Sequence, residues 1–131
     1  MKCNTHLKIN NDLCGTVTTL EEGRCVVTLT TTPEMGADTQ ELVHGGFVFG
    51  MADYAAMCAV NDPYVVLGGA ETSFLKPVRV GESLTAEAVV DETKGRKRIV
   101  PVTVRRGQEE VFKGTFTCFV LESHVLGESK G

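Results

Sequence analysis

One carboxylate stands alone in the longest apolar stretch of the chain. Residues 42–60, LVHGGFVFGMADYAAMCAV, carry a single formal charge, that of Asp53. Carboxylates are seldom buried without a partner, because losing hydration costs several kcal/mol unless hydrogen bonds replace the water. Two interpretations stay open. Asp53 either points into a solvated groove or caps a loop, or it is a desolvated nucleophile or general base whose pKa burial has raised towards a useful range.

The same stretch contains two adjacent glycines preceded by a histidine. We expect the helix to begin at His44-Gly45-Gly46, where the first amides have no intrahelical acceptor and the helix dipole favours negative charge. Adjacent glycines let a ligand approach the backbone closely. A thioester carbonyl placed there would have its developing oxyanion stabilised by the amides of Gly45, Gly46 or Phe47. A tight loop-to-helix turn is the alternative explanation for the two glycines.

The spacing of these groups makes a prediction about assembly. Gly46 and Asp53 are seven residues apart in the sequence, which is about 10 Å of rise in a regular helix. One helix therefore does not bring both groups comfortably to one scissile carbonyl. If both act on the same thioester they come from different chains, which predicts a homodimer with its long helices side by side and two composite sites.

Strand patterns flank this helix on both sides. A helix that is apolar all round must be covered all round, so a single sheet has to curl around it, with a second subunit on the remaining flank. Pro101 cannot donate to a strand ladder, which predicts an edge or a bulge at that point. The predicted strands cover residues 15–20, 24–31, 64–75, 83–91, 99–105 and 111–121, with the last four in an antiparallel meander.

Composition excludes several classes of protein. The 131 residues suit one domain, expected to span 1–131 with about 1–12 and 124–131 as loose tails, and the net charge of −4 argues against nucleic acid as a partner. Residues 1–12 lack the apolar core of an export signal, and residues 42–60 lack the flanking basic residues of a membrane span. Five cysteines without CxxC spacing suggest a reducing cytoplasm, and no motif makes Cys25 or Cys58 a thiolate nucleophile.

Two segments, VHGGFVFGMAD and FLKPVRVGESLTAEA, resemble the hotdog-fold thioesterase superfamily, in particular its branch of phenylacetyl-CoA-pathway and small acyl-CoA thioesterases. With the order of strands and helix, the resemblance spans nearly the whole chain. It implies an α+β hotdog fold in which a curved antiparallel six-stranded sheet wraps around one long central helix, in the order β-β-α-β-β-β-β. It also implies homodimers, frequently homotetramers, with no metal and no organic cofactor, since CoA enters only as part of the substrate.

The resemblance also assigns expected roles to four residues. Gly45 and Gly46 match the helix-start positions that polarise the thioester carbonyl, and Asp53 matches the catalytic carboxylate. His44 matches a histidine near the leaving sulfur, although simple packing at the helix start is an equal alternative. Asp38 occupies a loop position where relatives often carry Asn. The residue that positions the water molecule therefore stays open.

Candidate contacts with the substrate divide between an acyl pocket and the CoA nucleotide. Aromatic and methionine side chains at helical spacing either shape an acyl tunnel or belong to the core. Glu71 either assists Asp53 or faces outward from its strand. Arg79, near a turn, either binds a phosphate of CoA or only adds solubility. The substrate-binding candidates are Phe47, Tyr54, Met57, Asp38, Glu71 and Arg79.

From these features we expect hydrolysis of an acyl-CoA or acyl-carrier thioester to a free acid and a thiol. Asp53 is the expected nucleophile or general base, and the amides of Gly45 and Gly46 are the expected oxyanion donors. The alternative is a non-catalytic acyl-CoA sensor on the same fold. A hydratase is less favoured because no second histidine is suitably placed. The acyl group, the identity of the thiol and the choice between a direct and an anhydride mechanism are left open by the sequence.

Overall fold

The computed structural model describes residues 1–127 of the chain. It contains one long helix, one short α-helix, one 3-10 turn and seven strands. Each of the predicted strands is present to within a few residues, and Glu22 and Gly23 connect the first two strands. The elements are α1 (Asn11–Cys14), β1 (Thr16–Glu21), β2 (Arg24–Thr30), η1 (Pro33–Met35), α2 (Gly45–Val60), β3 (Val65–Phe74), β4 (Ser83–Val89), β5 (Glu92–Lys94), β6 (Lys97–Arg106) and β7 (Glu109–Val120).

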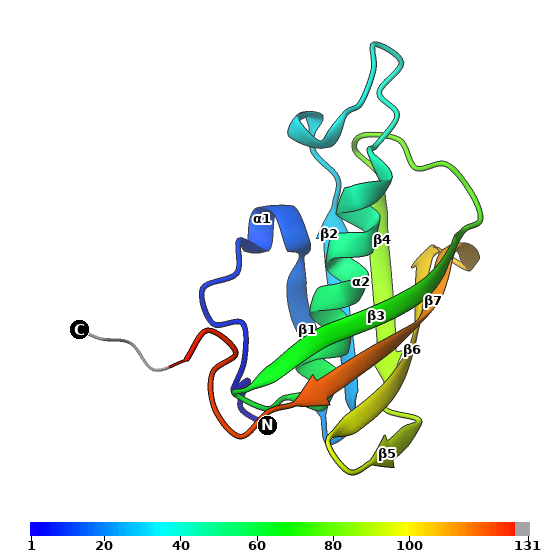
Figure 1. Ribbon diagram of the computed structural model, residues 1–131. Coiled ribbons are helices and arrows are strands. Elements are labelled where there is room, and N and C mark those ends of the chain that lie inside the picture. The colour runs from blue at the N-terminus through cyan, green and yellow to red at the C-terminus, as the bar shows by residue number, and fades with distance from the viewer. Residues whose placement is uncertain (128–131) are drawn as a thin grey trace.

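The strands form a single antiparallel sheet in the order β1-β2-β4-β6-β7-β3, with β5 paired to β6. In Figure 1, β1, β2 and β4 run alongside α2, whereas β7 and β3 cross it obliquely, so the sheet curves around the helix. Alternation along β2 and β4 places Cys25, Val27 and Leu29, with Leu84 and Ala86, on the buried face. The expected arrangement of a curved sheet around one helix is confirmed.

Helix α2 begins and ends where its sequence dictates. His44 is the N-cap residue in an extended conformation, and Asn61 ends the helix in the left-handed conformation, with its amide bonded to the Met57 carbonyl at 2.8 Å. Most side chains from Met51 to Ala59 are buried against the sheet. Despite this apolar character, no helix in residues 1–127 has both the length and the hydrophobicity needed to cross a membrane.

The prediction of six strands was wrong by one, and the predicted meander was wrong in its first strand. β5 is only three residues long, too short for an alternation pattern to show. β3 does not pair with β4; it forms the edge of the sheet beside β7, and residues 75–82 cross between the two. Pro101 lies where β6 changes partner, because β4 pairs with residues 102–105 and β5 with residues 97–99. Its missing donor therefore falls on a locally unpaired side of the strand.

The segment before α1, for which a loose tail was one expectation, packs on the C-terminal part of α2. The Asn4 amide donates to the Asn61 side chain at 2.7 Å, and the Asn61 amide group donates to the Lys2 carbonyl at 2.9 Å. The Cys3 thiol lies 3.8 Å from that of Cys58. At the other end, part of the expected tail, residues 128–131, lies outside the described residues.

Gly15, which joins α1 to β1, should tolerate no side chain. It has a φ of 94°, and a Cβ atom would lie 2.5 Å from Val27 and 2.8 Å from the Thr28 carbonyl. Gly81 has the same φ but open space around it, and so serves as a comparison without the steric clash. We expect Gly81→Ala to lower the free energy of unfolding by about 1–2 kcal/mol and Gly15→Ala by a further 1–3 kcal/mol or so. Urea unfolding of both variants measures the difference, and equal losses would contradict the steric argument.

Candidate functional site

The start of α2 presents free backbone donors at the surface. Phe47 donates its amide to the His44 carbonyl at 3.1 Å, so the amides of Gly45 and Gly46 precede the first turn's hydrogen bond. Among the described residues, no hydrogen bond uses either of these two amides as its donor. Gly46 is exposed and Gly45 half-buried. The positive end of the helix dipole lies here, and the first turn carries no acidic residue to occupy it.

The two glycines have different surroundings. A Cβ atom on Gly45 would lie 3.0 Å from a ring carbon of Phe74, so the end of β3 packs directly on the helix start. A Cβ atom on Gly46 would meet only the imidazole of His44, at 3.1 Å. That imidazole is exposed, makes no capping hydrogen bond and lies edge-on to Phe47 with ring centroids 6.2 Å apart. The position of His44 is therefore compatible with both expected roles, which are contact with the leaving sulfur and packing at the helix start.

Asp53 lies in the middle of α2 with one carboxylate oxygen sealed from water. Within the described part of the chain, Oδ1 is buried and has no hydrogen-bond partner. Burial raises the pKa of Asp53 from 3.8 to about 6. Burial first, and the Asp53 charge second, also raise the pKa of the Cys14 thiol and bring that of Cys118 to about 12. Asp53 therefore lies near α1 and β7 as a poorly solvated carboxylate. Its Oδ1 does not accept the hydrogen bonds that capping a loop would require.

One chain does not bring Asp53 to its own helix start. The separation of seven residues within the regular helix α2 (Gly45–Val60) corresponds to about 10 Å. Gly46, Gly50 and Asp53 do share one face, because positions i, i+4 and i+7 lie on the same side of a helix. Gly50 has nothing within 4 Å of the position of a Cβ atom. The face that joins the two halves of the site is therefore open.

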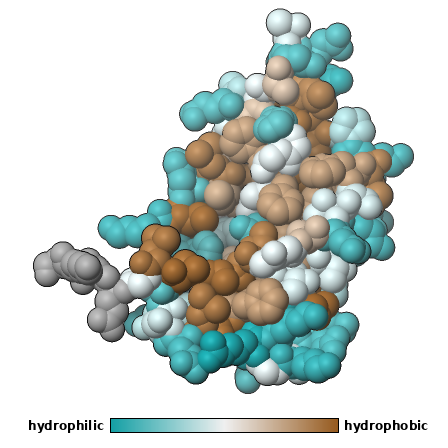
Figure 2. All heavy atoms as spheres, viewed as in Figure 1, coloured by the Kyte–Doolittle hydropathy of each residue, from teal (hydrophilic) through white to brown (hydrophobic). Residues whose placement is uncertain are grey.

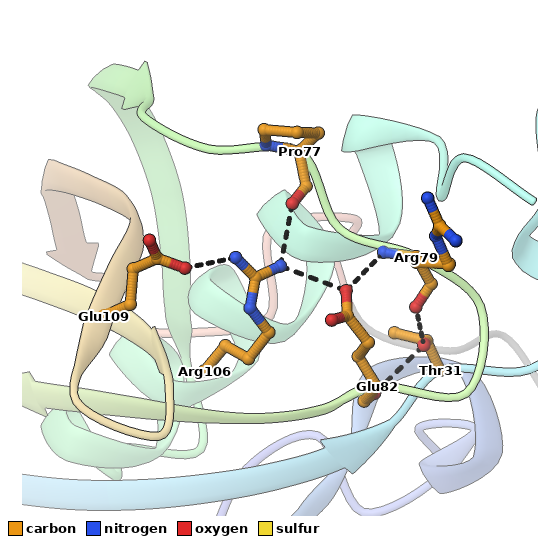
Figure 3. Close-up of polar contacts among 6 residues, drawn as sticks. All are labelled: Thr31, Pro77, Arg79, Glu82, Arg106 and Glu109. Atoms are coloured by element: carbon orange, nitrogen blue, oxygen red, sulfur yellow. Dashed lines mark hydrogen bonds and ion pairs between the residues drawn. The ribbon is translucent and has the colours of Figure 1, made fainter.

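A polar clasp fixes the crossing segment 75–82 that supports the helix start. The Arg106 guanidinium donates to the Pro77 carbonyl at 2.8 Å and to the Glu82 carboxylate at 3.0 Å, and it also pairs with Glu109 (Figure 3). Each partner lies near the surface, so each ion pair alone contributes little. Together these bonds join the end of β6 to both ends of the crossing segment.

The opposite side of the same segment is held by a threonine. The Thr31 hydroxyl donates to the carbonyls of Arg79 and Glu82 at 2.9 and 3.0 Å. The Glu82 carboxylate also accepts the Arg79 backbone amide at 2.6 Å (Figure 3). Buried hydroxyl groups require such partners, and Thr31 is buried. The segment is therefore fixed both from β6 and from the residue that follows β2.

The segment in turn braces the residues that enter α2. The Val43 amide donates to the Val78 carbonyl at 2.8 Å, and the Val80 amide donates to the Glu41 carbonyl at 2.9 Å. The next amide, of His44, is bonded to the Met35 carbonyl at 2.9 Å. The chain thus arrives at Gly45 in a fixed direction, which orients the free amides.

The remaining predicted contacts lie in three different places. Tyr54 and Met57 are buried within the chain at 6% and 1% exposure, where Tyr54 packs near His6, so both belong to the core. Phe47 is half-buried against the same core. Glu71 is exposed and paired with Thr115 on the face of the sheet that points away from α2.

The two predicted polar contacts before and after α2 do lie together. Asp38 accepts the amides of Gln40 and Leu42 at 2.9 and 3.2 Å, which shapes the loop before the helix. Asp38, Gln40 and Arg79 line a surface cavity of about 590 Å³. In Figure 3 the guanidinium of Arg79 points away from the Glu82 carboxylate, which belongs to the polar clasp around Arg106. Arg79 is therefore free to meet an anion beside the helix start.

Sequence reasoning missed Phe74. The side chain is 57% exposed at the end of β3, yet its ring lies edge-on to the buried Phe112 with centroids 5.1 Å apart. It borders an apolar cavity of about 310 Å³ that also includes Gly45. Its place near the end of the predicted strand 64–75 was visible in the sequence. Its contact with Gly45 was not, because the two residues are far apart in the chain.

The chain is similar to a known protein family, to a solved structure and to a curated relative. The family model described as "Thioesterase superfamily" matches residues 40–113. A crystal structure of an uncharacterized protein from Pyrococcus horikoshii, PH1136, superposes with a TM-score of 0.96 at 50% identity, covering 97% of this chain and 98% of that one. The acyl-coenzyme A thioesterase PaaI of Escherichia coli is 29% identical over 95% of this chain and 90% of its own.

Two further relatives are longer proteins. A methylthioribose-1-phosphate isomerase of Aquifex aeolicus is 47% identical over 98% of this chain but only 28% of its own length. A transcription factor FapR of Caldanaerobacter subterraneus is 28% identical over 88% of this chain and 58% of its own. The chain thus spans about a quarter to three-fifths of these relatives. Their printed activities belong to proteins with much additional sequence.

The raised pKa of Asp53 should appear as a pH-dependent cost of folding. Because the folded pKa of about 6 exceeds the unfolded value of 3.8, the cost is absent below pH 4, grows between pH 4 and 6 and is complete above pH 6. Asp53→Asn should therefore be more stable than the wild type at pH 8, by at most about 3 kcal/mol, and equal to it at pH 4. Urea titrations at fixed protein concentration measure this difference. Asp91→Asn, an exposed control, should show no such trend, and a difference independent of pH would contradict the assignment.

Proposed function

Because this chain belongs to the thioesterase superfamily, we propose that it hydrolyses an acyl-CoA or acyl-carrier thioester to a free acid and a thiol. The observation that supports the proposal most directly is the Asp53 carboxylate, whose Oδ1 is buried without a partner in the described residues and whose pKa is raised to about 6. A carboxylate of this kind is a stronger base and nucleophile than a hydrated one. The five free cysteines of the chain suit a reducing cytoplasm, where we propose that the protein resides.

The proposed reaction divides its tasks between two groups. Asp53 takes a proton from water as the water oxygen attacks the thioester carbonyl, or it attacks the carbonyl itself to form an anhydride that water then opens. In either case the carbonyl oxygen becomes an oxyanion that accepts hydrogen bonds from the amides of Gly45 and Gly46. Collapse of the intermediate breaks the C–S bond and releases the thiolate, which is protonated to the thiol. His44 stands beside these amides and is the proposed neighbour of the leaving sulfur.

We propose a homodimer because the two groups lie apart within one chain. β3 is an edge strand of ten residues with β7 on one side and no strand on the other among the described residues. Long exposed edges invite pairing with another chain. On the face shown in Figure 2, hydrophobic side chains form several patches with neutral and hydrophilic residues between them. A second copy on this flank would bring its own helix start towards Asp53, and further pairing of dimers into tetramers is part of the same expectation.

Similarity to the transcription factor FapR favours one alternative, a non-catalytic acyl-CoA sensor on the same fold. A sensor would be stabilised by acyl-CoA without releasing thiol. The unpartnered oxygen of Asp53 argues against this alternative, because a site that only binds gains nothing from an unsolvated carboxylate. Thiol release over a broad panel of acyl-CoAs separates the two functions.

The first test replaces the carboxylate. Asp53→Asn should lower kcat by at least about 100-fold, the usual contribution of a general base, while acyl-CoA binding is retained. In the wild type, kcat/KM should rise about tenfold per pH unit below pH 6 and level off above it, because Asp53 acts only when ionised and its pKa is about 6. Asp91→Asn should keep both the rate and the profile. Undiminished hydrolysis by the Asp53 variant would overturn the proposal.

The second test closes the open face of α2. Gly50→Leu should prevent the partner from approaching, giving a monomer by sedimentation analysis and the loss of most hydrolysis, whereas Gly50→Ala should have a smaller effect. Neither change should harm the fold of the single chain, because Gly50 has open space around it and both residues favour a helix by up to about 1 kcal/mol more than glycine. A fully active Gly50→Leu dimer would show that the helices do not pair through this face.

A further inference from the structure

Two cysteines that are far apart in the chain meet at the C-terminal end of α2. The sulfur atoms of Cys3 and Cys58 lie 3.8 Å apart, although 55 residues separate them in the sequence. Both are free thiols, Cys58 fully buried on α2 and Cys3 half-buried on the segment before α1. In a disulfide bond the sulfur atoms lie about 2.05 Å apart, so these two would have to approach by about 1.8 Å. A small movement of the N-terminal segment would therefore allow the bond to form.

Asn61 fixes the backbone on both sides of Cys3. Its side-chain oxygen accepts the Asn4 amide at 2.7 Å, and its side-chain amide group donates to the Lys2 carbonyl at 2.9 Å. Asn61 also ends α2, about one turn after Cys58. The N-terminus accordingly lies beside the C-terminal end of α2 in Figure 1. One asparagine thus holds the backbone of Cys3 close to that of Cys58.

The residues that follow Cys3 are packed as well. The Cys3 thiol donates to the Thr5 carbonyl at 3.2 Å, and Thr5 is buried. The Thr5 hydroxyl lies 2.8 Å from Nδ1 of His6, whose ring is 6.4 Å from that of Tyr54 on α2. Residues 2–6 are therefore held against α2 at several points, and the contact between the two thiols belongs to a fixed arrangement.

The exposure of the thiols indicates more than packing. Two thiols in contact can simply pack as small apolar groups. Here, however, Cys3 is partly accessible to a small oxidant, whereas Cys58 and Cys25 are both sealed from solvent. An accessible thiol beside a second thiol that can resolve its oxidised form is the arrangement that permits reversible oxidation. We propose that Cys3 and Cys58 form a modification site, at which hydrogen peroxide converts the two thiols to a disulfide bond that ties the N-terminal segment to α2.

The oxidation has two steps. The Cys3 sulfur attacks one peroxide oxygen, so an S–O bond forms, the O–O bond breaks, and a sulfenic acid and one water molecule result. The Cys58 sulfur then attacks the Cys3 sulfur, and the hydroxyl group leaves with the Cys58 proton as a second water molecule. The two sulfur atoms lose two electrons, which reduce the peroxide. Because burial raises the pKa of the Cys3 thiol and the thiolate is the reactive form, the first step is slow at neutral pH and requires sustained exposure to the oxidant.

The test treats the full chain with hydrogen peroxide, blocks the remaining thiols with an alkylating agent and maps cross-linked peptides by mass spectrometry. We expect a Cys3–Cys58 cross-link and a Tm that rises by on the order of 10 °C, because the cross-link restricts the unfolded chain. Dithiothreitol should reverse both changes. Cys3→Ser should show neither change, whereas Cys14→Ser, which removes another half-buried thiol, should show both.

A second variant tests whether the fold positions the two thiols. Asn61→Gly keeps a residue suited to the left-handed conformation, with φ of 54°, but removes both hydrogen bonds to residues 2 and 4. Cross-linking should then slow roughly tenfold, because Cys3 is no longer held in place. Cross-linking as fast in the urea-unfolded chain as in the folded chain would overturn the proposal. So would a Cys25–Cys58 bond as the main product, or further oxidation of Cys3 without a cross-link.

Discussion

A buried carboxylate oxygen, Oδ1 of Asp53, that has no hydrogen-bond partner within residues 1–127 is the constraint on which the rest of the site depends. Asp53 sits on a helix whose other side chains are apolar because they must fill the hollow of a curved sheet. The sheet supplies packing, but within residues 1–127 no side chain of it bonds to Oδ1 of the carboxylate. The result is one oxygen without solvation and a pKa near 6. A protein retains such a cost where the charge is used, since paired or exposed carboxylates are more stable.

The helix start faces the opposite requirement. Its amides must remain unbonded and exposed, yet they must point in one direction. Exposed amides at a helix end usually fray or find a capping side chain, and here His44 provides no such cap. Rigidity comes instead from outside the helix, through the crossing segment that Arg106 and Thr31 hold and that pairs with residues 41–43. These hydrogen bonds therefore fix the direction of the Gly45 and Gly46 amides without using either amide as a donor.

Sequence patterns predict local elements well and their partners poorly. The boundaries of α2 follow from the glycine pair and from Asp62-Pro63, and the β1–β2 turn follows from Gly23, because each depends on neighbouring residues. The place of β3 at the far edge depends on pairing with β7, some fifty residues later, for which alternation contains no information. The Arg106 clasp and the contact of Phe74 with Gly45 are hidden for the same reason. Asp53 was recognisable because its anomaly is local: one charge in an apolar run.

The open flank of α2 connects these two requirements. A partner that covered Gly50 with apolar side chains alone would remove more water from Asp53 and raise its pKa further, until the carboxylate was protonated at neutral pH and useless as a base. A partner that presents its helix start there would oppose this further rise. The unbonded amides and positive dipole end of Gly45 and Gly46 favour the ionised carboxylate while remaining available to an oxyanion. Pairing two copies through this face therefore lets the same unsatisfied groups complete each other, which neither copy can achieve alone across about 10 Å of its own helix.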